Sequence, residues 1–418
     1  MPTATTGRLT PVAVVVGAFL VCWLGVSGPA AGQDGAGLWV RASSLASSAA
    51  IRRLVEDASG AGFTTLLVQV PDLPPDRDRI PSPRRRRDRR GRAADAPAAD
   101  RWHLLLDEAR RRGLRVHAWF DVTRATPADA APPDRFHVTR QHPEWLMVPR
   151  ALAPRLARLD ASDPAHLAAL EEWSAESSEG VSALHLSPIL PAVAAHQGAR
   201  LTRLLARYRF DGVYLDSAQF PSSDFDYGRA AVSAFRADIT AGLTEARRRE
   251  LDARAAVDPL TYPDAFPSQW SRFRRSTMTA LVARLGNIVR RSLPGARVSV
   301  SVIADHDEAL GRRLQDWRTW AENGFIDVLC LRPGLETSED FERQLRVASQ
   351  FSSGADVWVG IAAGQLTPAD TFDRIRAAQR LGVDGIMISA HDTVMDRARM
   401  PPDHLQHIGL ALTADATP

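Results

Sequence analysis

Cysteine is scarce in this chain: its 418 residues include only Cys22 and Cys330. Cys22 lies in an N-terminal apolar stretch that we expect to be removed, which would leave Cys330 alone. The remaining chain could then form no internal disulfide. Burial of a hydrophobic core must therefore supply its stability.

Motifs of several enzyme classes are also missing. The sequence has no HEXXH motif and no His-x-His at the end of its first strand-like run, which argues against a metal hydrolase. It also has no GxSxG motif, which marks the nucleophile of many serine hydrolases. A Ser-His-Asp triad formed by residues far apart in the sequence stays an alternative. We expect neither a metal nor an organic cofactor.

The net charge is also low, at +3, and the excess of basic residues is concentrated in residues 74–100. This segment carries the run Arg84–Arg90 among Pro, Ala and Asp, so we expect a solvated, largely disordered loop. A contact with an acidic polymer of the cell envelope is the alternative. No aromatic residues interleave the arginines to stack bases, so we expect no nucleic-acid partner.

The N-terminus has the pattern of an export signal. Arg8 is followed by the apolar stretch Val12–Leu24, which is short for a membrane span, and small residues follow up to Gly32. We predict a signal peptide over 1–32, an exported protein in the periplasm or outside the cell, and no stable membrane span after cleavage. Retention as an N-terminal anchor is the alternative.

Strand-like and helical patterns alternate from Gly37 onward, and 45% hydrophobic residues are ample for one large core. Alternation of this kind indicates parallel βαβ units, and eight such units close a barrel. We predict an α/β fold, a single (β/α)8 TIM barrel over 33–418, with long loop insertions at 74–100 and 123–180. The predicted strands are 37–42, 64–70, 115–121, 211–216, 297–305, 325–332, 356–364 and 382–391.

Alternation along each strand separates the side chains that face the helices from those that face the barrel axis. Polar residues assigned to the axis fall at the C-terminal ends of strands, where barrel enzymes place their active sites: Arg41, Gln69, Asp121, Asp216, Asp305 and His391. Trp39, Trp119 and Tyr214 would form a floor on which sugar rings stack. The alternatives are core filling for the tryptophans, an ion pair with Arg41 for Asp216, and a one-residue register slip for Asp305.

The chain contains the stretches GLWVRAS, ARRRGLRVHAWFDVTRA and, most specifically, DGVYLDSAQFP followed by DFDYG. In these stretches it resembles the glycosyl hydrolase-like 10 family, exported bacterial barrels that include glycosidases of peptide-free peptidoglycan. The resemblance implies that Asp216 is the catalytic carboxylate. It also implies that the cleft wall contains Arg41, Gln69, Trp119, Asp121 and Arg124, and we add Gln219 from the DGVYLDSAQFP motif.

We therefore predict a glycoside hydrolase acting on a cell-envelope or extracellular polysaccharide, with Asp216 and Asp305 as its catalytic pair. Asp121, Asp307 and Glu308 stay open as the second carboxylate. The loops PDLPPDRDR and CLRPG depart from the family pattern, which motivates a carbohydrate-binding barrel with impaired catalysis as the alternative function. A third class, a phosphate-handling barrel, rests on a loose likeness in GVDGIMIS.

Overall fold

The computed structural model describes residues 35–70, 98–127, 137–176, 183–332, 337–396 and 398–414. The predicted signal segment lies outside these residues, as does the basic loop up to residue 97. The basic loop was predicted to end at residue 100, but helix α2 (Ala98–Arg111) begins three residues earlier, at Ala98.

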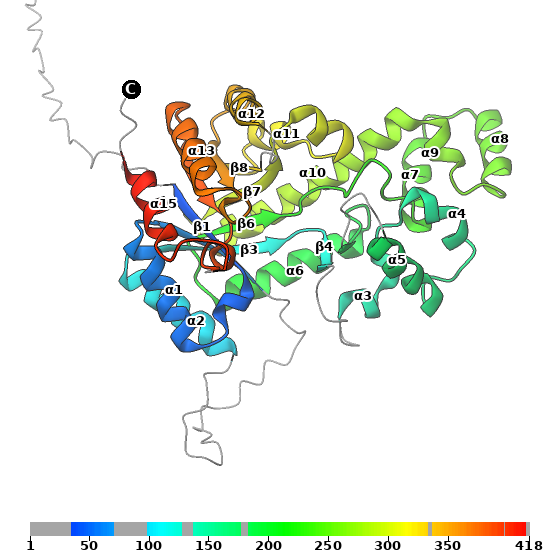
Figure 1. Ribbon diagram of the computed structural model, residues 1–418. Helices are drawn as coiled ribbons and strands as arrows, with labels where there is room; N and C mark the ends of the chain where they lie inside the picture. The colour runs from blue at the N-terminus through cyan, green and yellow to red at the C-terminus, as the bar shows by residue number, and fades with distance from the viewer. Residues whose placement is uncertain are drawn as a thin grey trace, which may run out of the picture. The chain divides into compact units, whose positions relative to one another are not determined.

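Eight parallel strands form a closed barrel at the centre of the fold (Figure 1), which confirms the predicted architecture. The strands are paired in the order β1-β10-β9-β8-β7-β6-β3-β2, with β1 hydrogen-bonded to both β10 and β2. Their bounds are β1 Ala36–Val40, β2 Thr65–Gln69, β3 Arg115–Asp121, β6 Gly212–Asp216, β7 Arg297–Ile303, β8 Val328–Arg332, β9 Asp356–Ile361 and β10 Gly385–Ile388.

Several strands are shorter than predicted. β1 ends at Val40, β7 at Ile303 and β10 at Ile388, so Arg41, Asp305 and His391 follow their strands instead of ending them. Strand alternation does not govern side-chain direction in a turn. The direction of these three side chains therefore depends on the local turn.

Amphipathic helices surround the barrel. Several begin at a side chain that caps the first turn: Ser47 accepts a hydrogen bond from Ala50 N (3.1 Å), Thr337 from Asp340 N (3.2 Å) and Thr367 from Asp370 N (3.1 Å). The principal helices are α1 Ser48–Gly60, α2, α6 Pro191–Arg207, α10 Pro267–Ser292, α11 Trp317–Glu322, α12 Ser338–Gln350, α13 Pro368–Arg380 and α15 His404–Thr413.

Two separate layers of side chains confirm the predicted alternation. Leu38, Val213 and Val300 belong to the large core between the strands and the helices. A smaller cluster inside the barrel contains Trp39 and Tyr214. The two faces of each strand therefore differ, as the apolar pattern predicted.

Large rings inside the barrel occupy space that glycines of other strands leave free. A Cβ atom added to Gly360 would lie 2.5 Å from the Trp39 ring, and one added to Gly212 would lie 2.7 Å from the His117 ring. Neither strand could carry a larger residue at these positions without moving the ring. This pairing of large and small residues fills the barrel axis below the strand ends.

Two insertions lie together at one end of the long helix α10 (Figure 1). The predicted insertion 123–180 contains β4 Arg124–Pro127, α3 Val138–Gln141, α4 Ala153–Leu156 and α5 Pro164–Glu176. The sequence did not predict the second insertion, which contains α7 Arg229–Thr240, α8 Glu245–Ala255 and α9 Thr261–Ala265. An ion pair between Arg150 and Asp264 (2.7 Å) joins the two.

The DFDYG motif ties this second insertion to the first. Asp226 is buried, and its Oδ1 accepts hydrogen bonds from Val148 N (2.8 Å) and Gly228 N (3.0 Å). Buried Arg274 of α10 donates to the Ser223 carbonyl (2.6 Å) and to the Phe225 carbonyl. These contacts give the motif a structural role.

No helix in the described part of the chain is long and apolar enough to cross a membrane.

Candidate functional site

A cavity of about 630 Å³ lies over the C-terminal ends of the barrel strands. Its walls include side chains from β1, β2, β3, β6 and β8 and from the turns that follow β9 and β10. Seven of the predicted site residues line it: Trp39, Arg41, Gln69, Trp119, Arg124, Tyr214 and Asp216.

Asp216 occupies the wall of this cavity at the last position of β6, with 3% of its side chain exposed. Its Oδ2 accepts a hydrogen bond from Trp119 Nε1 (3.0 Å), and its Oδ1 accepts one from the Ser217 backbone N–H (2.8 Å). Both oxygens therefore have a fixed donor, which holds the carboxylate in one orientation.

Two arginines flank the same carboxylate. Arg332 Nη1 lies 3.5 Å from Oδ1, and Arg124 Nη2 lies 3.8 Å from Oδ2. Arg124 also lies 3.8 Å from Asp121, which is the register partner of Asp216 on the neighbouring strand β3. Arg124 therefore contacts both of these carboxylates.

The aromatic residues differ in how much surface they offer to a ligand. Tyr214 is buried between Trp39 (ring centroids 5.9 Å apart) and Trp119 (6.1 Å apart). Burial, reinforced by the charge of Asp216, raises the pKa of Tyr214, so its hydroxyl stays protonated. Trp39 is 6% exposed, whereas Trp119 is only partly buried. Of these three rings, Trp119 is therefore the most exposed.

Four predicted site residues do not line the cavity. Asp121 lies beside it and accepts a hydrogen bond from Ser217 Oγ (3.4 Å). Gln219 follows β6, and its carbonyl accepts a hydrogen bond from Thr123 Oγ1 (3.3 Å). Asp305 Oδ1 accepts one from Glu308 N (2.8 Å) beyond the end of β7.

His391 is the fourth of these residues. It begins the short helix α14 (His391–Val394), and the charges of Asp57 and Asp392 act on it. Burial outweighs these charges and lowers its pKa. The ion pair considered for Asp216 and Arg41 is not present, because Arg41 pairs with Asp392 (3.5 Å).

Sequence reasoning missed two arginines of the cavity, Arg332 and Arg374. Arg332 has the same parity on β8 as Cys330, which belongs to the cluster inside the barrel. The alternation rule, applied to this strand, would have found it. No comparable signal marks Arg374, which reaches the cavity from α13.

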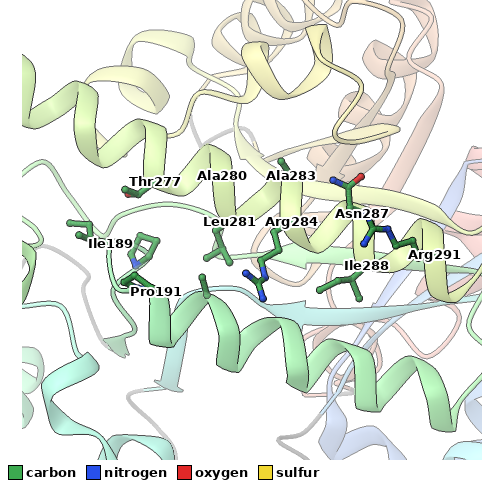
Figure 2. A pocket seen from close by; sticks show the side chains of 12 residues that line it. Ile189, Pro191, Thr277, Ala280, Leu281, Ala283, Arg284, Asn287, Ile288 and Arg291 are labelled. Atoms are coloured by element: carbon green, nitrogen blue, oxygen red, sulfur yellow. The ribbon is translucent and has the colours of Figure 1, made fainter. Parts of the chain in front are cut away.

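A second hollow, of about 670 Å³, lies on the outer side between α6 and α10. Figure 2 shows Leu281, Arg284 and Ile288 of α10 pointing toward α6. None of the described residues that line this hollow is acidic. It therefore offers no carboxylate for glycoside hydrolysis. The cavity at the strand ends contains Asp216 among the predicted site residues, and we take it as the candidate active site.

The fold is similar to that of a solved glycoside hydrolase domain and to that of a solved β-amylase catalytic domain. The PgaB (BpsB) glycoside hydrolase domain from Bordetella bronchiseptica superposes with a TM-score of 0.58 at 12% identity, over 92% of this chain and 99% of that domain. The β-amylase catalytic domain from Paenibacillus polymyxa gives 0.59 at 8% identity, with the same two coverages. At these identities the likeness shows the fold alone.

Sequence comparison identifies a family. The glycosyl hydrolase DigH of Escherichia coli K12 is 23% identical over 254 residues, which are 57% of this chain and 47% of that protein. The chain thus spans about half the length of the curated relatives that it matches. The glycosyl hydrolase-like 10 family matches this sequence over residues 81–367, which is well over half of the chain. The chain belongs to the glycosyl hydrolase-like 10 family.

Proposed function

We propose that this protein hydrolyses glycosidic bonds of a cell-envelope or extracellular polysaccharide, with peptide-free peptidoglycan glycan as the first substrate to test. The observation that carries the proposal is the oriented carboxylate of Asp216 in the wall of the cavity, beside Trp119. The family match supports the reaction class. The predicted signal segment supports the location.

Asp216 would attack the anomeric carbon directly or activate a water molecule there. A glycosidase stabilises positive charge at the anomeric carbon with one carboxylate and protonates the leaving oxygen with a second carboxyl group. The N–H groups of Trp119 and Ser217 hold both Asp216 oxygens, so the carboxylate need not reorganise as that charge develops.

We test two of the four residues that the sequence leaves open as the acid. Asp305 is the partner that the sequence predicts, and its carboxylate lies in the turn after β7. Asp121 is the carboxylate that the structure brings beside Asp216, because the two are register partners and both contact Arg124. Asp305→Asn and Asp121→Asn, assayed separately, distinguish them.

The central experiment compares wild type with Asp216→Asn on peptide-free peptidoglycan glycan and on a panel of other polysaccharides, with release of reducing ends as the readout. Asparagine keeps the size of the side chain but removes its charge. We expect kcat to fall by about 10²–10⁴-fold, the usual contribution of an acid or base. Circular dichroism and thermal unfolding show whether the variant is folded.

The outcomes separate enzyme from binding protein. Equal turnover by the two folded proteins would remove Asp216 from the mechanism. Binding of a glycan by both, without turnover by either, would favour a carbohydrate-binding barrel. One observation motivates this second function: Asp216 is the single acidic residue among the described residues that line the cavity.

A further inference from the structure

The turn that follows Asp216 has a backbone conformation that serine rarely adopts. Ser217 is buried, and its φ of 55° lies in the left-handed region, where a side chain crowds the backbone. Its N–H donates to Asp216 Oδ1 (2.8 Å), and its carbonyl accepts a hydrogen bond from Thr123 Oγ1 (2.6 Å). The N–H and the carbonyl belong to the two peptide groups on either side of Ser217. Both peptide groups are therefore fixed, the first of them by the carboxylate itself.

Thr123 holds this turn from the neighbouring segment of the barrel. It is fully buried and lies two residues beyond the end of β3. Its hydroxyl has a single proton, and the short bond to the Ser217 carbonyl uses it, because a carbonyl can only accept. The hydroxyl oxygen can still accept a hydrogen bond, and His185 Nδ1 lies 3.1 Å from it. His185 is therefore the donor to Thr123, through Nδ1–H.

His185 is suited to this task because the fold keeps its imidazole neutral. It belongs to the short strand β5 (Ala183–His185), which is antiparallel to β4, with Arg124 as its register partner. Burial, and then the positive charges of Arg124 and Arg313, lower the pKa of His185 from 6.5 to about 3. A neutral imidazole has one N–H and one bare nitrogen, and its hydrogen bond decides which nitrogen carries the proton. The Thr123 hydroxyl places that proton on Nδ1.

We propose that Thr123 and His185 are positioning residues for Asp216: the imidazole N–H orients the Thr123 hydroxyl, and the hydroxyl holds the turn whose N–H stays on the carboxylate. A carboxylate that loses a fixed donor can rotate away from the reacting geometry, which lowers the rate. The effect on rate rests on the proposed function, whereas the hold on the carboxylate can be measured without turnover. A merely structural role would change stability and leave kcat of the folded protein unaltered.

Kinetics of matched variants test the effect on rate. Thr123→Val removes the hydroxyl and keeps the shape of the side chain, whereas Thr123→Ser keeps the hydroxyl. On a polysaccharide that wild type hydrolyses, we expect kcat of Thr123→Val to fall by about 10-fold and Thr123→Ser to recover most of the loss. KM should change little, because Thr123 is not among the described residues that line the cavity.

Thr139→Val is the control for these variants. Thr139 lies in the same insertion and is equally buried, and its hydroxyl is likewise close to a histidine Nδ1, that of His137 (2.8 Å). The substitution therefore removes a comparable hydroxyl that does not contact the turn after Asp216. It should leave kcat unchanged.

The hold on Asp216 also has a spectroscopic signature. Asp216 and Ser217 form the only Asp-Ser dipeptide in the sequence. Labelling the aspartate carbonyls with ¹³C and the serine nitrogens with ¹⁵N therefore gives one correlated amide signal, that of Ser217. A hydrogen bond to a carboxylate moves the amide proton downfield. We expect this signal to move upfield in Thr123→Val, to return in Thr123→Ser and to stay in place in Thr139→Val.

The same two measurements test His185. His185→Leu removes the donor, whereas His185→Asn places an amide N–H near the position of Nδ1. We expect His185→Leu to lower kcat and to move the Ser217 signal in the same direction as Thr123→Val does, and His185→Asn to restore both. Thermal unfolding shows whether each variant is folded. If Thr123→Val does not fold, the two His185 variants decide the proposal.

Three results would overturn the proposal: a Ser217 signal that stays in place in the folded variants, an unchanged kcat in Thr123→Val beside an active wild type, or an equal fall of kcat in Thr139→Val. Failure of the proposed function gives a different result, because wild type then hydrolyses none of the polysaccharides. The Ser217 signal alone would then decide whether Thr123 and His185 hold the carboxylate.

Discussion

Stability of this fold should fall in mild acid because of His117, which lies inside the barrel. The side chain is 1% exposed, its ring is stacked on Trp358 with centroids 6.4 Å apart, and its Nδ1 has no hydrogen-bond partner among the described residues. Burial, and then the positive charges of Arg115 and Arg297, lower the pKa of His117 from 6.5 to about 3. The folded protein therefore holds this histidine neutral.

The sign and size of the effect follow from this shift. Between pH 6.5 and 3 the unfolded chain binds a proton at this histidine that the folded chain does not, so the free energy of unfolding decreases as the pH falls. At pH 5, which is 1.5 units below the pKa of an unfolded-chain histidine, protonation of His117 in the unfolded chain should lower the free energy of unfolding by about 2 kcal/mol relative to high pH. Other buried histidines, such as His404, add to the total.

Urea unfolding at pH 7 and pH 5, followed by tryptophan fluorescence, measures this effect. The substitution His117→Gln removes the titrating group, so the difference between the two pH values should shrink by about 2 kcal/mol whatever the variant's absolute stability. His103→Gln, an exposed position on α2, is the matched control and should leave the difference unchanged. An unaltered pH dependence in His117→Gln would show that the ring is protonated in the folded state.

Two further substitutions probe the site and its support. Trp119→Phe keeps an aromatic ring but removes the N–H that Asp216 accepts, so kcat should fall by about 10-fold or more; an unchanged kcat would show that this donor does not matter. Arg274→Met leaves the Ser223 and Phe225 carbonyls without their buried donor and should lower the free energy of unfolding by about 2–4 kcal/mol. Arg272→Met, at an exposed position on the same helix, should change the free energy of unfolding little. Equal losses in the two variants would show that the hydrogen bonds of Arg274 to these carbonyls do not stabilise the fold.

The fold was readable from the sequence because its signals are local. Apolar alternation in runs such as 211–216 sets both the strand and the faces of its residues, since successive side chains of a strand point to opposite sides. Tyr214 and Asp216 share the inward parity, and Asp216 ends its strand. Its place in the cavity therefore followed from covalent geometry and from strand order.

Prediction failed where the chain leaves regular structure. Asp305 and His391 follow strands that end earlier than predicted, and the turns direct them to Glu308 N and toward Asp57. The helices α7–α9, between β6 and α10, were not predicted.

The surroundings of Asp216 were decided by the closed barrel. The strand pattern predicts that this carboxylate faces the axis, but its partners come from far along the chain: Trp119 is 97 residues away and Arg332 is 116 residues away. Only closure of the eight strands brings them to one cavity, and only the packing of α13 adds Arg374. The sequence by itself determined which strand end carries the carboxylate. The tertiary structure decided the charge around it, because that charge is a sum over residues that no local pattern connects.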